Sequence, residues 1–305
     1  MIYKEGIVDE NSKISVVIPT YKRSQMLLRL LDSLLNSTIH FKEIIVIDGD
    51  PMSDNIRLLS SEFPFVTYYR LDHNAYVGEM RNMGLQVSKG DYVFMVDDDN
   101  IVKSDCVEKL YSAMTNDDLI GVAGPVTCYF DERNIIMYAG GNYSPIMRRT
   151  IFLKSGENVD TIKEDEYEVD GFANSYMFRK EAALKVYPIP DRILFGGEDG
   201  YIQYRIKKEL GLKLVLIGEA IVYHDIKKQE FFTRMTPFKL YYLTRGKITF
   251  ELDLDKYKYR FLIFLFIFIF GYLYIAFNSE KKKEGVMAVF QGLFDGLFRN
   301  YPNKY

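Results

Sequence analysis

The sequence predicts an α/β fold with a mostly parallel sheet and flanking helices. Along the first hundred residues, short apolar runs rich in β-branched side chains alternate with segments of helical periodicity. Strands that alternate with helices are typical of a parallel sheet with crossover helices. The chain has 305 residues, of which 48% are hydrophobic and 27% charged. It is therefore long enough to bury a large core, and its composition excludes a disordered protein.

The predicted elements follow one another without an internal repeat. The expected strands are Ile14–Pro19, Glu43–Asp48, Val66–Arg70 and Tyr92–Val96. The expected helices between them are Ser24–Leu35, Ile56–Phe63 and Gly78–Lys89. Ligands of such sheets bind beyond the C-terminal strand ends. We therefore expect a site at the residues that follow the strands, which are Pro19–Arg23, Asp48 and Asp97–Asn100.

Composition and charge exclude several classes of function. Lys and Arg number 39 against 42 Asp and Glu, so the net charge of −3 gives no basic field for nucleic acid. Two cysteines without a CxxC pair and three histidines cannot build a disulfide framework or a Cys/His zinc site. The first residues lack the apolar stretch of a secretory signal, so the reducing cytoplasm is the expected compartment.

The C-terminal part is unusually apolar. Phe261–Phe277 carries no charge over seventeen residues, close to the lower limit of about 17–25 residues for a membrane-spanning helix. Lysines flank it on both sides, so the positive-inside rule gives no direction. Residues 286–298 then repeat apolar side chains at helical spacing, as an interfacial helix does. We predict that residues 259–305 associate with a membrane, by crossing it or lying in it. The alternative is that both stretches pack onto the protein.

Three successive carboxylates, Asp97, Asp98 and Asp99, follow the strand Tyr92–Val96 directly. Such neighbours repel one another unless a cation or hydrogen-bond donors compensate. In an extended turn, Asp97 and Asp99 would project to one side and share Mg²⁺ or Mn²⁺ with phosphate oxygens, while Asp98 would point away. A solvated acidic turn is the alternative. The position at a strand end favours the metal.

Taken in order, these motifs resemble the family 2 nucleotide-sugar glycosyltransferases, which are inverting enzymes with the GT-A fold. The matching residues are Val17–Arg23, Asp48, Asn74, Gly78, Arg81, Asn82, Gly84, Asp97, Asp99, Glu198 and Asp199. The resemblance covers roughly residues 14–250. Tyr241–Lys247 is similar to a stretch of rhamnosyltransferase-type relatives, with Gly246 replacing their asparagine. The absence of Trp excludes the QxxRW motif of processive relatives and so favours addition of one sugar.

The resemblance implies a donor site, residue by residue. Tyr21 would stack on the nucleotide base, Asp48 would accept from a base N–H, and Arg81 would bind phosphate or a base carbonyl. Ordinary packing for Tyr21 and a surface charge for Arg81 are the alternatives. The residues expected to bind the donor are Pro19, Thr20, Tyr21, Arg23, Asp48, Arg81, Asp97 and Asp98.

The resemblance also implies catalytic and metal-binding roles. Asp199 would be the base that takes the acceptor's proton, with Glu198 beside it at the start of a helix over Tyr201–Leu210. A role of these acids at the helix dipole alone is the alternative. Asp97, Asp99 and His224 would hold Mg²⁺ or Mn²⁺, with His224 following the strand-like Leu214–Ile217.

The sequence therefore predicts a GT-A catalytic domain over residues 1–225, divided near residue 125 into a nucleotide-binding and an acceptor half. A helical connector would span 226–258, and the membrane-associated segment 259–305. The predicted reaction is inverting, metal-dependent transfer of a sugar from a UDP-, GDP- or dTDP-sugar to a hydroxyl of a lipid-linked or membrane-proximal glycan, at the cytoplasmic face of the cell membrane. The alternatives are a polyprenyl-phosphate glycosyltransferase and a silent scaffold that only binds the sugar nucleotide.

Overall fold

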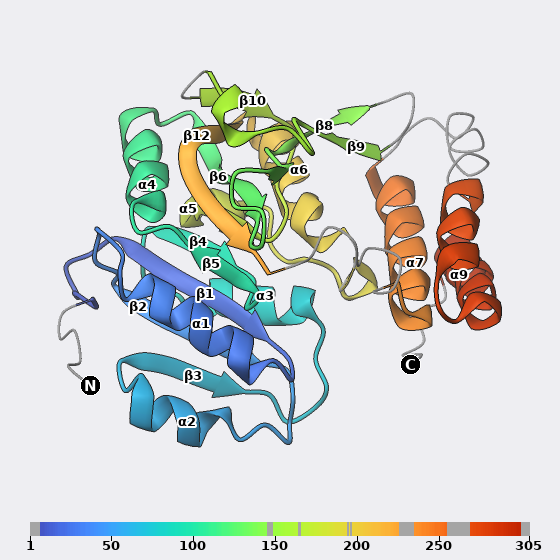
Figure 1. Ribbon diagram of the computed structural model, residues 1–305, viewed down its shortest axis with the longest axis horizontal. Coiled ribbons are helices and arrows are strands. Elements are labelled where there is room, and N and C mark those ends of the chain that lie inside the picture. The colour runs from blue at the N-terminus through green and yellow to red at the C-terminus, as the bar shows by residue number, and fades with distance from the viewer. Residues whose placement is uncertain are drawn as a thin grey trace.

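A computed structural model describes residues 7–144, 149–163, 166–193, 195, 197–225, 235–254 and 269–299. Its centre is a ten-stranded sheet with helices on both faces (Figure 1). Eight strands lie in the order β10-β12-β6-β11-β4-β1-β2-β3, while β5 pairs with β12 and β7 pairs with β6. Two buried hydrophobic clusters, one on each face, hold the helices against the sheet.

The first half of the sheet is parallel. Its strands are β1 (Ile14–Thr20), β2 (Glu43–Asp48), β3 (Val66–Arg70) and β4 (Tyr92–Val96). The predicted bounds of β2, β3 and β4 are confirmed, and β1 is one residue longer than predicted. All residues of β1 and β2 are buried, because helices cover both faces. The ends of β1 and β2 lie side by side, with Thr20 in register with Asp48.

The second half of the sheet is mixed. Its strands are β5 (Asn100–Val102), β6 (Ile120–Tyr129), β7 (Ile136–Tyr138), β10 (Glu166–Val169), β11 (Ser175–Arg179) and β12 (Lys213–His224). The strand β11 lies between β4 and β6 and is antiparallel to both. The strand β12 is longer than the predicted Leu214–Ile217, and its end brings His224 into register with Asn100. A separate hairpin pairs β8 (Gly141–Ser144) with β9 (Arg149–Phe152).

The helices divide between the two faces of the sheet. One face carries α1 (Ser24–Leu34), α2 (Asn55–Glu62) and α4 (Cys106–Asn116). The other carries α3 (Val77–Val87), α5 (Lys180–Lys185) and α6 (Glu198–Leu210). Two short 3₁₀ helices are η1 (Val159–Thr161) and η2 (Asp191–Ile193). Helix α3 lies very close to β1, since a Cβ on Gly84 would stand 2.2 Å from Val17 Cγ1. Helix α6 begins at Glu198, three residues before the predicted start.

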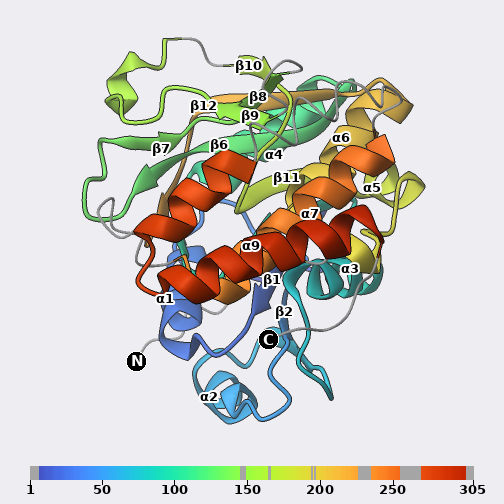
Figure 2. The same cartoon turned by 90° about the vertical axis from the view of Figure 1, so that its right-hand side faces the viewer.

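Two C-terminal helices pack against each other beside the sheet (Figures 1 and 2). They are α7 (Pro237–Leu254) and α9 (Lys282–Leu297), and residues 269–278 are helical as well. Glycines on α9 permit a close approach, because a Cβ on Gly292 would stand 2.5 Å from the carbonyl oxygen of Tyr241 on α7. The Tyr241 hydroxyl donates to the buried Asp295 of α9 over 2.7 Å.

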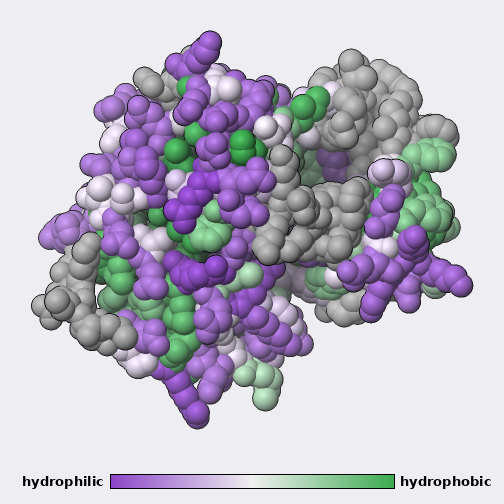
Figure 3. Space-filling model, viewed as in Figure 1, coloured by the Kyte–Doolittle hydropathy of each residue, from purple (hydrophilic) through white to green (hydrophobic). Residues whose placement is uncertain are grey.

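The predicted C-terminal membrane helices are not supported. Among the helices within the described ranges, none combines the length and the apolar character that crossing a bilayer requires. Residues 261–268 of the predicted stretch lie outside the described residues, as do 226–234 and 255–258 of the predicted connector. The apolar residues that repeat over 286–298 lie on two sides of the helix, one buried and one exposed. Val289 and Leu293 are buried, whereas Phe290 and Phe294 are exposed. Figure 3 shows apolar residues at the outer edge of this region.

Candidate active site

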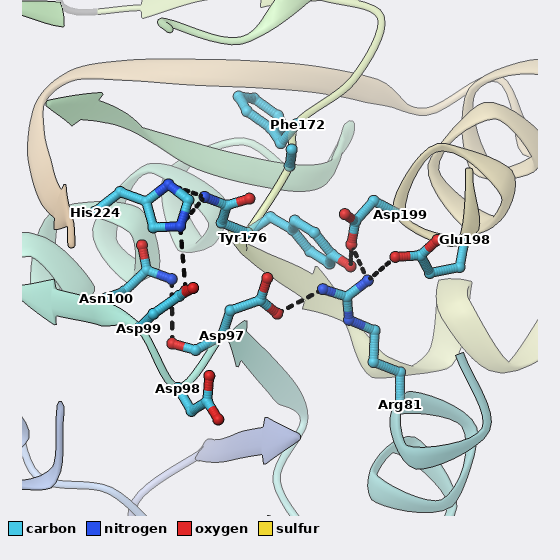
Figure 4. A network of polar contacts seen from close by, with 12 residues as sticks. Arg81, Asp97, Asp98, Asp99, Asn100, Phe172, Tyr176, Glu198, Asp199 and His224 are labelled. Carbon is cyan, nitrogen blue, oxygen red and sulfur yellow. Dashed lines mark hydrogen bonds and ion pairs between the residues drawn. The ribbon is translucent and has the colours of Figure 1, made fainter. Parts of the chain in front are cut away.

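The fold collects most of the predicted site residues at the C-terminal ends of β1, β4 and β12 and the N-terminus of α6 (Figure 4). Thr20 and Arg23 tie the loop after β1 to the acid motif. The Thr20 hydroxyl donates to Asp98 Oδ2 over 2.7 Å. The Arg23 guanidinium lies 3.1 Å from Asp98 Oδ1 and 2.8 Å from Asp99 Oδ2. Burial raises the pKa of Asp98 to about 7, against the opposing effect of Arg23.

The three acids have different partners, and a metal shared by Asp97 and Asp99 stays a prediction. Residues 98 and 99 form a turn that the Asn100 N–H closes onto the Asp97 carbonyl over 3.2 Å. The Asp97 side chain contacts Arg81 and the Asp99 side chain contacts His224. Asp98 is buried beside Thr20 and points away from the Asp97 and Asp99 carboxylates (Figure 4).

Asp99 and His224 form a pair that suits a divalent cation. His224 Nε2 lies 3.1 Å from Asp99 Oδ1. This oxygen is buried, and among the described residues no donor has the geometry of a hydrogen bond to it. Burial would raise the pKa of Asp99, but His224 and Arg23 outweigh it and lower this pKa to about 2. In the part of the chain that is described, no group of three or more His, Cys, Asp or Glu residues could hold a metal. Two protein ligands fit Mg²⁺ or Mn²⁺ nevertheless, since such ions take their remaining ligands from phosphates and water.

Asn174 supports this pair from a neighbouring loop. Its side-chain amide lies 2.9 Å from His224 Nδ1, and its carbonyl accepts from the Asp97 N–H over 2.9 Å. Asn174 has a φ of 63°, a left-handed conformation that asparagine adopts more readily than most residues. Asn174 was not among the predicted site residues. Asn174 directly precedes β11 and His224 ends β12, so only the folded sheet brings the two side chains together.

Arg81 lies at the centre of the second cluster. Its guanidinium contacts three carboxylates: Asp97 Oδ1 at 2.6 Å, Glu198 Oε1 at 3.1 Å, and Asp199 Oδ1. The Arg81 side chain is only 3% exposed, so one buried cation faces up to three negative charges. Burial would lower the pKa of Arg81, but Asp199, Tyr176, Asp97 and Glu198 raise it well above its usual range. The surface-charge alternative for Arg81 is therefore excluded, and its binding of the donor stays a prediction.

Asp199 has a second partner that the sequence did not indicate. The Tyr176 hydroxyl of β11 donates to Asp199 Oδ1 over 2.5 Å. Burial raises the pKa of Asp199 to about 7. Arg81 and the Tyr176 hydrogen bond act in the opposite direction, while Glu198 and Asp97 raise it further. Burial also raises the pKa of Glu198. A carboxyl group that titrates near neutrality suits proton transfer.

The predicted base-binding residues lie at the ends of β1 and β2. Asp48 is fully buried and accepts from Asn55 Nδ2 at 2.7 Å and from the Tyr68 hydroxyl at 2.9 Å. Tyr21 is 37% exposed, and its hydroxyl donates to Asn74 over 3.2 Å. Pro19 is buried within β1. Their contacts with a nucleotide stay predictions. The roles of Asn55 and Tyr68 were missed, because each lies in a different element from Asp48.

The fold and this acid-rich site define a glycosyltransferase of the GT-A class. Residues 15–183 match the family described as glycosyl transferase family 2, and the chain belongs to that family. Among curated proteins, glycosyltransferase GlyG of Streptococcus pneumoniae is 28% identical over 213 residues, which are 63% of this chain and 70% of GlyG.

Solved structures share the fold at low sequence identity. GalNAc-T7, solved with UDP, GalNAc and Mn²⁺, superimposes with a TM-score of 0.64 at 17% identity over 96% of this chain. This chain spans only 59% of that protein. The mannosyltransferase PcManGT of Pyrobaculum calidifontis, solved with GDP-Man and Mn²⁺, has a TM-score of 0.55 at 13% identity, over 92% of this chain and 75% of its own.

Proposed function

We propose that this chain transfers a sugar, with inversion, from a nucleoside-diphosphate sugar to a hydroxyl of a lipid-linked or membrane-proximal glycan, with help from a divalent metal. One observation carries the proposal: Asp199 and the Asp99–His224 pair belong to one site, connected through Arg81 and Asp97. Asp199 could serve as a base for an acceptor. The Asp99–His224 pair could face the diphosphate of a donor.

The donor side depends on charge. Asp99 and His224 would hold Mg²⁺ or Mn²⁺, which would neutralise charge on the departing diphosphate. Two relatives in fold were solved with Mn²⁺ and with UDP or GDP-Man, which supports this class of ligand. Thr20, Arg23 and Asp98 already hold the loop after β1 in place by hydrogen bonds. That loop would then bind the nucleotide without a large rearrangement.

The acceptor side depends on proton transfer. In a single displacement, the acceptor oxygen bonds to the anomeric carbon while the bond from that carbon to the diphosphate oxygen breaks. The proton of the acceptor hydroxyl passes to Asp199. Arg81 keeps part of the Asp199 population ionised near pH 7, against burial and two neighbouring acids. If the acceptor were a polyprenyl phosphate, it would be an anion already and would need no base.

Thermal unfolding with nucleotides tests the donor site. A ligand that binds only the native state stabilises it, by about 2.7 kcal/mol when its concentration is 100 times Kd. We expect one of UDP, GDP and dTDP to raise the Tm in the presence of Mn²⁺ but not without it. The Asp99→Ala variant should lose this shift, whereas Asp118→Ala, at an exposed acid remote from the site, should keep it. Absence of a shift with all three nucleotides in folded protein would refute the metal-dependent donor site and favour the scaffold.

We also propose that the outer face of the C-terminal helices rests on the cytoplasmic surface of a membrane. Seven large apolar side chains in this region are between 44% and 72% exposed: Phe270, Tyr274, Phe277, Met287, Phe290, Phe294 and Phe298. On each helix they recur every three or four residues, as interfacial helices require. The residues Glu280–Glu284, at the start of α9 and just before it, add three exposed lysines and two glutamates, a net positive charge suited to anionic lipid.

Cosedimentation with vesicles of phosphatidylcholine and phosphatidylglycerol tests this contact. We expect the full chain to bind, and a variant with Phe290, Phe294 and Phe298 all replaced by serine to lose most of its binding. The matched control is Met52→Ser, which removes an exposed apolar side chain of another region and should bind normally. Equal binding of the triple variant and the wild type would show that this face does not contact lipid.

A further inference from the structure

We propose that Tyr176 is a positioning residue for the base: its hydroxyl fixes one oxygen of the Asp199 carboxylate and favours the ionised form. The proposal rests on the proposed function, in which Asp199 takes the acceptor's proton. Nothing in the sequence motifs assigns a role to Tyr176. Its apolar surroundings in β11 predict an ordinary core position.

The position of Tyr176 is rigid. Its strand β11 pairs with β4 on one side and β6 on the other, and the side chain is only 1% exposed. The ring packs edge-on against Phe178 with 5.0 Å between ring centroids. The Arg81 guanidinium carbon lies 5.9 Å from the Tyr176 ring centroid. The hydroxyl therefore cannot move away from Asp199 without a rearrangement of the core.

Among the described residues, both side-chain contacts of the Asp199 carboxylate engage the same oxygen. The Tyr176 hydroxyl and the Arg81 guanidinium each contact Oδ1. When two donors from different elements fix Oδ1, the orientation of the whole carboxylate is set. The oxygen Oδ2 is then the one left to accept a proton from an acceptor hydroxyl. Tyr176 thus acts on the geometry of the base without touching the reacting atoms.

Tyr176 also affects the charge of Asp199. The groups that face Asp199 are Arg81 from α3, Glu198 from α6, Asp97 after β4, Tyr138 from β7 and Tyr176 from β11. The two acids disfavour the ionised carboxylate, and Arg81 already serves three carboxylates. A phenol donates a hydrogen bond without adding net charge. Burial keeps the pKa of Tyr176 well above its usual range, so this hydroxyl remains a donor.

The test compares Tyr176→Phe with the wild type. This variant keeps the ring and removes the hydroxyl alone. Asp199 is titrated by ¹³C NMR in aspartate-labelled protein, where its carboxyl signal is assigned by its absence from Asp199→Asn. We expect the titration midpoint to rise by about one pH unit, since a hydrogen bond to a charged group is lost. We expect kcat to fall about 10- to 100-fold with KM for the donor unchanged.

Turnover is followed as release of nucleoside diphosphate from UDP-, GDP- or dTDP-glucose, according to which nucleotide stabilises the chain. Tyr92→Phe is the matched control, because the Tyr92 hydroxyl accepts from Arg179 at 3.0 Å and lies at the opposite end of β4. It should leave the midpoint and kcat unchanged. If Tyr176→Phe does not fold, 3-fluorotyrosine at position 176 replaces it. The hydroxyl of 3-fluorotyrosine is more acidic and donates a stronger hydrogen bond, so the titration midpoint of Asp199 should fall.

The outcomes separate the two proposals. An unchanged midpoint in Tyr176→Phe or in the fluorotyrosine protein overturns the role of Tyr176, even if Asp199→Asn is inactive. Full turnover by Asp199→Asn instead overturns the base itself and leaves the hydrogen bond as a structural contact. A shifted midpoint together with a lowered kcat supports both.

Discussion

The Asp199→Asn variant is expected to lose about 10²- to 10⁴-fold in kcat, the usual contribution of a general base, while it keeps its affinity for nucleotide. Asparagine fills the same volume and can still accept from Tyr176, but it cannot take a proton. Nucleoside-diphosphate release at saturating donor measures kcat, and the thermal shift with nucleotide and Mn²⁺ measures binding.

The pH dependence of the wild-type rate supplies a second check on Asp199. Burial raises its pKa to about 7, and only the ionised form is a base. The rate should therefore rise with pH through about 7 and level off above it. In Asp199→Asn this limb should vanish. Asp118→Asn, at a 94% exposed side chain, is the control and should match the wild type. Full activity of the Asp199→Asn variant would point instead to an anionic acceptor such as a polyprenyl phosphate.

The Arg81→Met variant is expected to be destabilised by about 3–5 kcal/mol, as when one partner of a buried ion pair is removed. Methionine replaces most of the aliphatic volume but leaves Asp97, Glu198 and Asp199 without their shared cation. Urea unfolding followed by circular dichroism measures the loss. Arg57→Met removes an arginine that pairs with Asp54 in solvent and should leave the stability unchanged.

The loss in Arg81→Met should depend on pH with a defined sign. Without the guanidinium, the pKa values of Glu198 and Asp199, which burial already raises, should rise further. The folded state then binds more protons than the unfolded state at every pH between about 4 and the raised values, so the free energy of unfolding falls as pH rises. The variant should thus be less destabilised at about pH 5 than at about pH 8. A loss that is equal at both pH values would contradict this explanation.

The strands were predictable where local pattern decides the structure. Glu43–Asp48 and Tyr92–Val96 are short, dense in apolar side chains and followed by acids, and the structure gives them the same bounds. The acid turn was less predictable. Sequence alternation suggested a shared side for Asp97 and Asp99, but it could not show that Asp97 contacts Arg81 and Asp99 contacts His224. The Asp97 N–H also donates to the carbonyl of Asn174, a residue that is distant in sequence.

The partners of the site residues were not predictable, because they depend on strand order. Tyr176 reaches Asp199 only because β11 enters the sheet next to β4 in the antiparallel direction. The C-terminal helices show a further limit. An apolar repeat looks alike whether it packs on protein or faces outward. In α9 the same repeat does both, with Val289 buried and Phe290 exposed.

The central place of β11 also determines the order in which the sheet can be completed. On the ribosome, β1 to β4 are made well before Ser175–Arg179, so β4 remains an unpaired edge until β11 arrives. Apolar edge strands are templates for pairing with other chains. Contacts between residues distant in sequence also form slowly. The strand that carries Tyr176 to the base is thus also the strand that covers the free edge of β4, and this edge stays open until residues 175–179 have been synthesised.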